Sequence, residues 1–287
     1  MALVFQRLDN YQQIIPQQVH SERTLLEQGK GILMKHWVQS ADAVACAVSA
    51  VAMGGGLWSS SASPVRAATI GSCATLAEER IRVTCATKDK PVRACDPADV
   101  KLACQGAHDA IYFLRAQGFN TANRVVIVIA QKLPPAGTAS TGGLYLDSPD
   151  VCHGDTDQAV HLLTYSEFKK FKNWFHIPIE DSLYRSLAAH EVAHAISDCN
   201  FKLARPTIQA KEYLAYVTMF ATMAPAVRER ILRKSPGHGY EGDWQMGTTI
   251  YLADPMRFGV QAYRHFLKPD NGRSYLHAIL AGKVLIE

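Results

Sequence analysis

Two histidines and a glutamate lie close together in SLAAHEVAHAISDC, residues 186–199. The order HEVAH places His190 and His194 four positions apart within a run of Ala, Val, Ile and Leu. Residues at i and i+4 project from the same face of a helix, so both imidazoles can reach one zinc ion at about 2.0–2.1 Å. Glu191 is offset by one position and can reach water beside the metal. The segment therefore predicts a zinc-binding helix that carries its own general base.

An alternative interpretation needs no metal. His190 and His194 can be core histidines bonded to backbone or carboxylate groups, with Glu191 on the solvent face. Two buried histidines without a metal would each need a separate hydrogen-bonding partner. The apolar neighbours also favour a dry site in which charges interact strongly. Spacing and surroundings together favour zinc.

A catalytic zinc site needs three protein ligands and one open position. The longer pattern HExxHxxGxxH is excluded, because Ser and Asn occupy positions 197 and 200. Glu212 follows His194 by eighteen residues and opens a nearly charge-free run. A carboxylate at the edge of such a helix needs a partner, which favours Glu212 as the third ligand. The alternative is an exposed first-turn glutamate that interacts with the helix dipole, and Asp254 and His238 are further ligand candidates.

HExxH followed one helix later by a glutamate resembles the gluzincin (thermolysin-like) group of zinc metallopeptidases, over residues 180–223. The resemblance implies that His190, His194 and Glu212 bind zinc. It also implies that Glu191 activates a zinc-bound water for attack on a peptide carbonyl, with a peptide or protein as substrate. A strand before the helix would line the cleft and pair with an extended peptide, and 144–148 and 159–165 are the two candidates.

The chain departs from the thermolysin-like pattern at Tyr216, where that group has an aspartate that orients a histidine. Asp198, one turn after His194, is either its substitute or a helix-end carboxylate. The reaction also needs a group that stabilises the oxyanion. The candidates are Tyr213, Tyr216, His238 and Tyr240.

Two other functions remain open from the sequence. The first is a catalytically inactive zinc-binding or structural protein, exported and built on the same zincin-like scaffold. The second is an exported, disulfide-linked domain without metal. Nucleotide binding is not indicated, because neither GxxxxGK[ST] nor GxGxxG occurs in the chain.

The elements around these residues predict an α+β fold in which a small mixed sheet with one helix precedes a helical half. Periodicity and β-branched content predict strands at 79–87, 124–133, 144–148 and 159–165. A helix capped by Asp96 or Asp99 should extend to about Gln117. Further helices are expected at 166–175, 180–198, 208–234 with a break at Pro225, 255–268 and 274–285.

The N-terminal segment predicts export. Residues 34–67 have the order of a signal peptide, with basic residues, an apolar run and a small-residue cleavage site ending at Ala67. Residues 1–33 are then either an over-long N-terminal extension or an untypical leader, and 68–287 are expected to form one zincin-like domain. The glycines at 54–56 and Pro64 make a poor membrane-spanning helix, so a permanent anchor is not expected. A lipoprotein site at Cys73 is a weaker alternative. The expected location is the periplasm or the exterior.

Cysteine usage agrees with export. One cysteine, Cys46, lies inside the expected signal peptide, which leaves six in the mature chain. An even number in an exported protein predicts three disulfides. Four cysteines lie within residues 73–104, so we expect bridges there without a fixed pairing, while Cys152 and Cys199 remain as a natural pair.

Composition excludes some partners. The chain has 48% hydrophobic and 20% charged residues, enough to form a core. The net charge is +4, and acidic and basic residues are interspersed along the chain. The largest basic cluster, residues 169–172, is expected to be a solvated helix face rather than a nucleic-acid surface.

Overall fold

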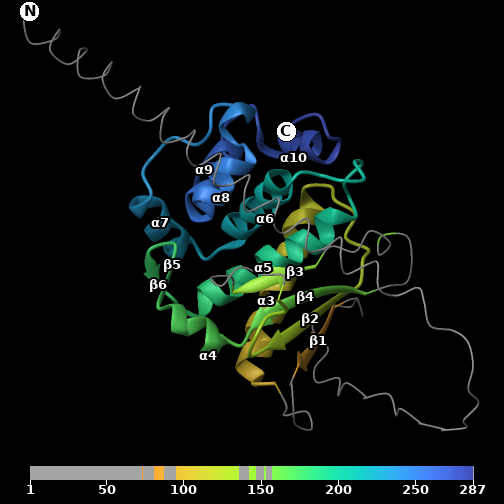
Figure 1. Ribbon diagram of the computed structural model, residues 1–287, viewed down its shortest axis with the longest axis vertical. Helices are drawn as coiled ribbons and strands as arrows, with labels where there is room; N and C mark the ends of the chain where they lie inside the picture. The colour runs from red at the N-terminus through yellow and green to blue at the C-terminus, as the bar shows by residue number, and fades with distance from the viewer. Residues whose placement is uncertain are drawn as a thin grey trace, which may run out of the picture. The chain divides into compact units, whose positions relative to one another are not determined.

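The computed structural model describes residues 73, 81–86, 95–135, 142–146, 152 and 157–286 (Figure 1). All of them belong to one compact unit, Pro64–Glu287. The expected extension 1–33 and signal peptide 34–67 lie outside the described residues. Among the residues that the structure describes, no helix has the length and apolarity needed to cross a membrane.

A four-stranded mixed sheet begins the fold, in the order β1-β2-β4-β3. The first three strands in this order are parallel and β3 is antiparallel to β4. The bounds are Ile81–Ala86 for β1, Val125–Ala130 for β2, Gly143–Tyr145 for β3 and Gln158–Leu163 for β4. Each lies within or next to its expected segment, so the four expected strands are confirmed. Strand β2, VVIVIA, is interior because β-branched side chains fill both faces.

From Asp181 onward the described elements are helices, so the expected helical half is confirmed. The bounds are Pro97–Ala116 for α3, which precedes this half, Asp181–Asp198 for α5, Ile208–Thr222 for α6, Pro225–Lys234 for α7, Thr248–Ala253 for α8, Pro255–Phe266 for α9 and Gly272–Leu280 for α10. Asp96, not Asp99, caps α3 by accepting from the Ala98 N–H. The expected break at Pro225 is confirmed, because α6 ends at Thr222 and Pro225 begins α7.

The prediction of a single helix over residues 166–175 is wrong. Helix α4 covers only Tyr165–Phe168, a 3-10 turn follows at Lys169–Phe171, and a hairpin pairs β5 (Asn173–Trp174) with β6 (Ile177–Pro178). Lys172 ends the 3-10 turn with a positive φ, and Phe175 and His176, also with positive φ, form the turn of the hairpin. The Phe175 ring is fully buried beside Tyr216 and Phe220 of α6. Tertiary packing of one aromatic ring therefore overrides the local helical pattern.

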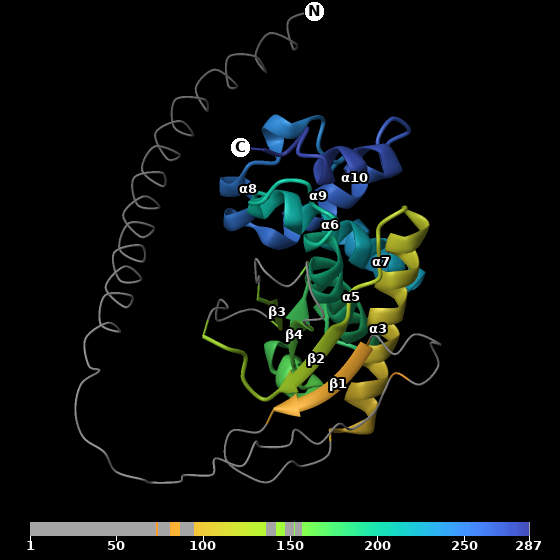
Figure 2. The same cartoon turned by 90° about the vertical axis from the view of Figure 1, so that its right-hand side faces the viewer.

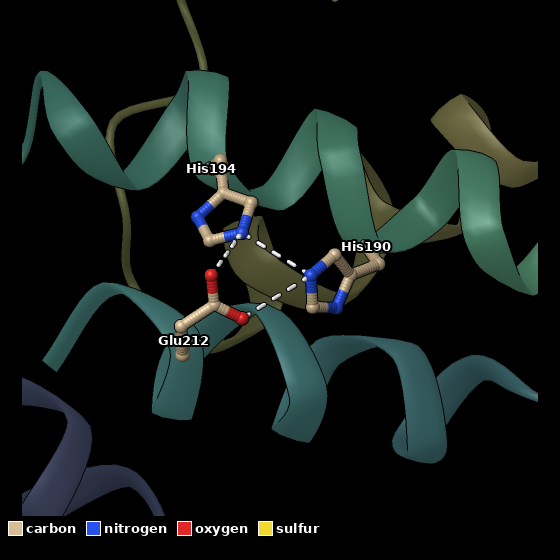
Figure 3. A group of neighbouring side chains, drawn as sticks. All are labelled: His190, His194 and Glu212. Atoms are coloured by element: carbon tan, nitrogen blue, oxygen red, sulfur yellow. Dashed lines mark hydrogen bonds and ion pairs between the residues drawn. The ribbon is translucent and has the colours of Figure 1, made fainter. Parts of the chain in front are cut away.

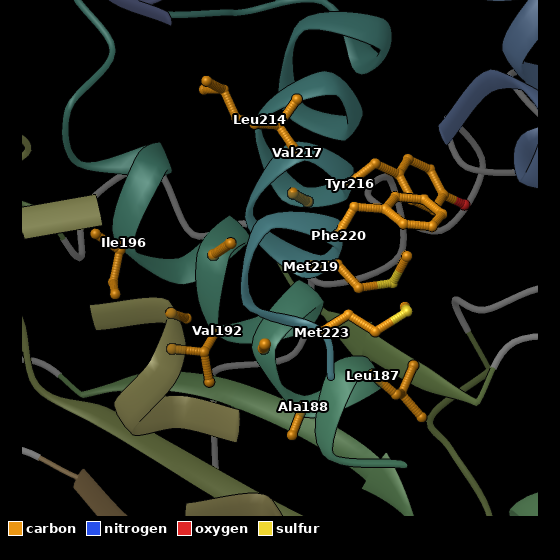
Figure 4. Close-up of a cluster of buried hydrophobic side chains, with 14 of the residues drawn as sticks. Leu187, Ala188, Val192, Ile196, Leu214, Tyr216, Val217, Met219, Phe220 and Met223 are labelled. Carbon is orange, nitrogen blue, oxygen red and sulfur yellow. The ribbon is translucent and has the colours of Figure 1, made fainter. Parts of the chain in front are cut away.

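Helix α5 lies at the centre of the fold, between the sheet and α6 (Figure 2). Helix α3 packs against α5 at Gly106, where an added Cβ would meet the Arg185 carbonyl oxygen at 2.2 Å. On its other side, α5 packs against α6 through a dense apolar layer (Figure 4). Because α5 is surrounded, it is apolar on nearly all sides rather than along one stripe. Polar residues in such a helix are costly unless they have a specific partner.

The described residues contain three disulfides: Cys73–Cys104, Cys85–Cys95 and Cys152–Cys199. The expected Cys152–Cys199 pair and the expected bridges within residues 73–104 are therefore confirmed. Disulfides persist in oxidising compartments. The structure thus agrees with an exported location.

Candidate metal centre

Helices α5 and α6 bring three potential metal ligands together. His190 and His194 project from one face of α5, and Glu212 projects toward them from α6 (Figure 3). Thr207 starts α6 by accepting from the Ala210 N–H, which places Glu212 in the second turn of that helix. All three side chains are largely removed from solvent, with 13% of the Glu212 side chain exposed. The exposed first-turn glutamate considered above is therefore not what the structure contains.

The distances between the ligand atoms suit a small cation. The Nε2 atoms of His190 and His194 lie 3.2 Å apart, and each lies 3.5 Å from a different Glu212 carboxylate oxygen. Ligands held at 2.0–2.1 Å by a tetrahedral ion are separated by about 3.3 Å. One ligand atom from each of the three residues lies within 4.8 Å of the others, so the group could hold a metal ion.

Electrostatics also favour a cation between α5 and α6. Burial alone lowers the pKa of His190, but its hydrogen bond to Glu212 and the charges of Glu191 and Glu212 raise it above the ordinary 6.5. Burial raises the pKa of Glu212, while the charges of His194 and His190 lower it below its ordinary value. The site thus holds an anionic carboxylate and attracts positive charge, which a proton or a metal ion can supply.

Glu191 lies beside this cluster and is 5% exposed. The backbone N–H of Tyr145 hydrogen-bonds its carboxylate. Burial raises the pKa of Glu191 to about 7, the Glu212 charge adds to the rise, and His190 and the Tyr145 N–H oppose it. A buried carboxyl group with a pKa near neutrality is suited to take up and release a proton. The interpretation of Glu191 as a solvent-facing residue is excluded.

Edge strand β3 contacts Glu191 directly. A Cβ atom added at Gly143 would lie 2.5 Å from Glu191 Cγ and 2.7 Å from its Oε1. Glycine is needed here because the carboxylate occupies the space of a side chain. Of the two candidate cleft strands, β3 lies at the sheet edge, while β4 is paired on both sides.

Two aromatic rings support the histidines. The Tyr216 ring lies 4.5 Å from the His190 ring, centroid to centroid, and the Tyr145 ring stacks on His194 at 6.4 Å. Nδ1 of His190 has no hydrogen-bond partner among the described residues. Tyr216 therefore occupies the space beside His190 without supplying the carboxylate that usually orients a metal-bound imidazole. Asp198 accepts from the Tyr145 hydroxyl at 3.1 Å and thus contacts a neighbour of His194.

Several sequence candidates have other roles. Asp254 caps α9 by accepting from the Arg257 N–H, and it is not in the one ligand group found among the described residues. His238 is exposed. The Tyr213 hydroxyl bonds to His265 at 2.7 Å, within the core. The Tyr240 ring packs against Phe258.

Sequence reasoning missed Tyr251. This residue lies on α8, and its hydroxyl hydrogen-bonds Glu212. Burial and the charge of Glu212 raise the pKa of Tyr251, so it keeps its proton at neutral pH. No pattern in the sequence marks Tyr251, because its contact with Glu212 depends on how α8 packs beside α6.

Comparison with known proteins gives one match. The profile of a family described as "Family of unknown function (DUF6639)" matches residues 91–287. No curated protein and no solved structure matches the chain. The matched range includes every residue of the candidate metal centre.

Proposed function

We propose that this chain, which belongs to the DUF6639 family, is an exported zinc-dependent peptidase. The observation that carries the proposal is the position of Glu191. Its buried carboxylate lies beside a His-His-Glu ligand group and is held by the backbone of an edge strand. A structural metal site needs only ligands, whereas this site also holds a buried carboxyl group, Glu191, which is not one of the three ligand residues.

The chemistry follows from the residues present. Zinc, when bound by His190, His194 and Glu212, would supply a Lewis acid that polarises a carbonyl and makes water more acidic. Glu191 would take a proton from water and deliver it to the leaving amine. Tyr251 donates its hydroxyl proton to Glu212 and would hold this carboxylate in the orientation that a metal ligand needs.

The substrate would bind along β3. This strand pairs with β4 on one side only, within the described sheet. An extended peptide can add to such an edge through main-chain hydrogen bonds. The Tyr145 N–H of β3 hydrogen-bonds the Glu191 carboxylate. A peptide that lies along β3 would therefore have a carbonyl group close to Glu191. We therefore propose a peptide or protein as substrate.

Chelation tests the proposal. We expect the oxidised full-length protein to contain about one zinc ion per chain and to cleave members of a random peptide library. Removal of the metal with 1,10-phenanthroline should abolish cleavage, and added zinc should restore it. A protein that holds zinc but cleaves nothing would refute peptide hydrolysis and favour the inactive zinc-binding protein.

Replacement of Gly143 by alanine tests the contact between β3 and the proposed base. The new methyl group would overlap Glu191 Cγ and Oε1, so the carboxylate or the strand must shift. Misplacement of a catalytic group by about 1 Å can cost roughly 100-fold in rate, and we expect a loss of this order in kcat/KM with zinc retained. Gly247→Ala is the matched control, because no atom lies within 4 Å of its added Cβ. Equal activities of the two variants would contradict the placement of Glu191.

A further inference from the structure

We propose that the Cys152–Cys199 disulfide is a structural latch on the metal site, which it holds in shape through Gln158 and Tyr145. The zinc-affinity part of its test rests on the proposed function, and the hydrogen-exchange part does not. The inference starts from the position of the bridge. Cys199 caps the C-terminus of α5, five residues after His194, and Cys152 lies in the connection between β3 and β4.

Gln158 links the disulfide to the site. Its side chain is 2% exposed, and its Nε2 lies at hydrogen-bonding distance from both sulfurs of the bridge. Its Oε1 lies 2.8 Å from the Tyr145 hydroxyl. A buried amide that loses its partners costs free energy. Removal of the bridge would therefore disturb the orientation of Gln158 and with it the Tyr145 contact.

Tyr145 contacts two residues of the candidate metal centre. Its ring stacks on His194, and its backbone N–H hydrogen-bonds the Glu191 carboxylate. Its hydroxyl lies between Gln158 and Asp198, and Asp198 also pairs with Lys211 of α6 at 3.1 Å. Tyr145 thus connects β3 directly to α5, and to α6 through the Asp198–Lys211 pair.

Strand β3 depends on this connection because it is short. It has three residues, and within the described sheet it pairs only with β4. Short edge elements with few buried contacts open at low free energy. The Tyr145 hydroxyl and the disulfide therefore add to the close packing of Gly142 and Gly143 against α5. Tyr145 is a positioning residue, since it acts through His194 and Glu191.

The other two bridges involve β1 and α3, and neither has a hydrogen bond to Gln158 among the described residues.

The test compares two pairs of substitutions in the full-length protein. Cys152→Ala/Cys199→Ala removes the latch, and Cys73→Ala/Cys104→Ala removes a bridge that has no hydrogen bond to Gln158 among the described residues. The measurements are hydrogen exchange at the Tyr145 amide and zinc affinity by competition with a chelator. We expect the first pair to speed exchange at least 10-fold and to weaken zinc binding about 10- to 100-fold, as for other outer-shell contacts. We expect the second pair to change neither.

Tyr145→Phe gives an independent test that leaves every cysteine intact. It removes only the hydroxyl, and should weaken zinc binding by itself. Removing Cys152 and Cys199 in this background should then add little, because the pathway is already broken. Additive losses, or equal effects of the two cysteine pairs, would overturn the latch. If the wild type binds no zinc, the proposed function fails, and exchange at the Tyr145 amide still decides the latch.

Discussion

Glu191→Gln is expected to abolish peptide hydrolysis while the protein still binds about one zinc ion per chain. The amide keeps the shape of the carboxylate but cannot take up a proton. General acid–base catalysis contributes about 10²- to 10⁴-fold, so kcat/KM should fall by that factor. Zinc content should persist because the three ligand residues are unchanged. The measurements are kcat/KM on a cleaved library peptide and zinc content of the purified protein.

A matched control separates this role from a general effect of charge. Glu229→Gln also removes one negative charge, but its side chain is 65% exposed on α7, where it pairs with Arg233. We expect this variant to keep full activity. Full hydrolysis by Glu191→Gln with zinc bound would exclude Glu191 as the base. The same variant decides between a peptidase and the inactive zinc-binding alternative, since only the peptidase has an activity to lose.

Much of the fold could be predicted because local patterns and tertiary structure agree. Five of the six residues of VVIVIA are β-branched and the segment forms interior strand β2, and Pro225 begins α7 after α6 has ended at Thr222. The segment 166–175 shows where such reasoning fails. Its polar and aromatic spacing suits a helix, yet Phe175 is buried against α6. That contact joins residues distant in the chain, so no local pattern contains it.

For the candidate site, too, some residues could be predicted from local sequence and others depend on tertiary packing. The separation of His190 and His194 follows from helix geometry alone, and a charge-poor helix made Glu212 a reasonable third ligand. Gly143, Tyr145 and Tyr251 were not assigned to the site, because strand β3 and helix α8 position them. Each has a common residue type and no distinctive spacing. Their roles become visible only when β3 and α8 are packed against α5 and α6.

Glu212→Gln is expected to weaken zinc binding by more than about 100-fold. Loss of an outer-shell partner alone costs 10- to 100-fold, and Glu212 is predicted to be a direct ligand with oxygens 3.5 Å from both imidazoles. The neutral amide is a poorer ligand and leaves the positive charge of the ion unbalanced. Zinc affinity by chelator competition measures the loss. Zinc should also raise the Tm of the wild type, by binding the folded state, but not that of the variant.

Glu180→Gln is the matched control for this substitution. Glu180 also pairs with a cationic side chain, Arg230, at 2.7 Å, but it lies at the start of α5 and outside the ligand group. Its loss should leave zinc affinity unchanged. Zinc bound equally well by Glu212→Gln would exclude Glu212 as a ligand and direct the search to Asp254 and His238. That result would also require α8 or the loop at 235–243 to move toward α5, because Asp254 now caps α9 and His238 is exposed.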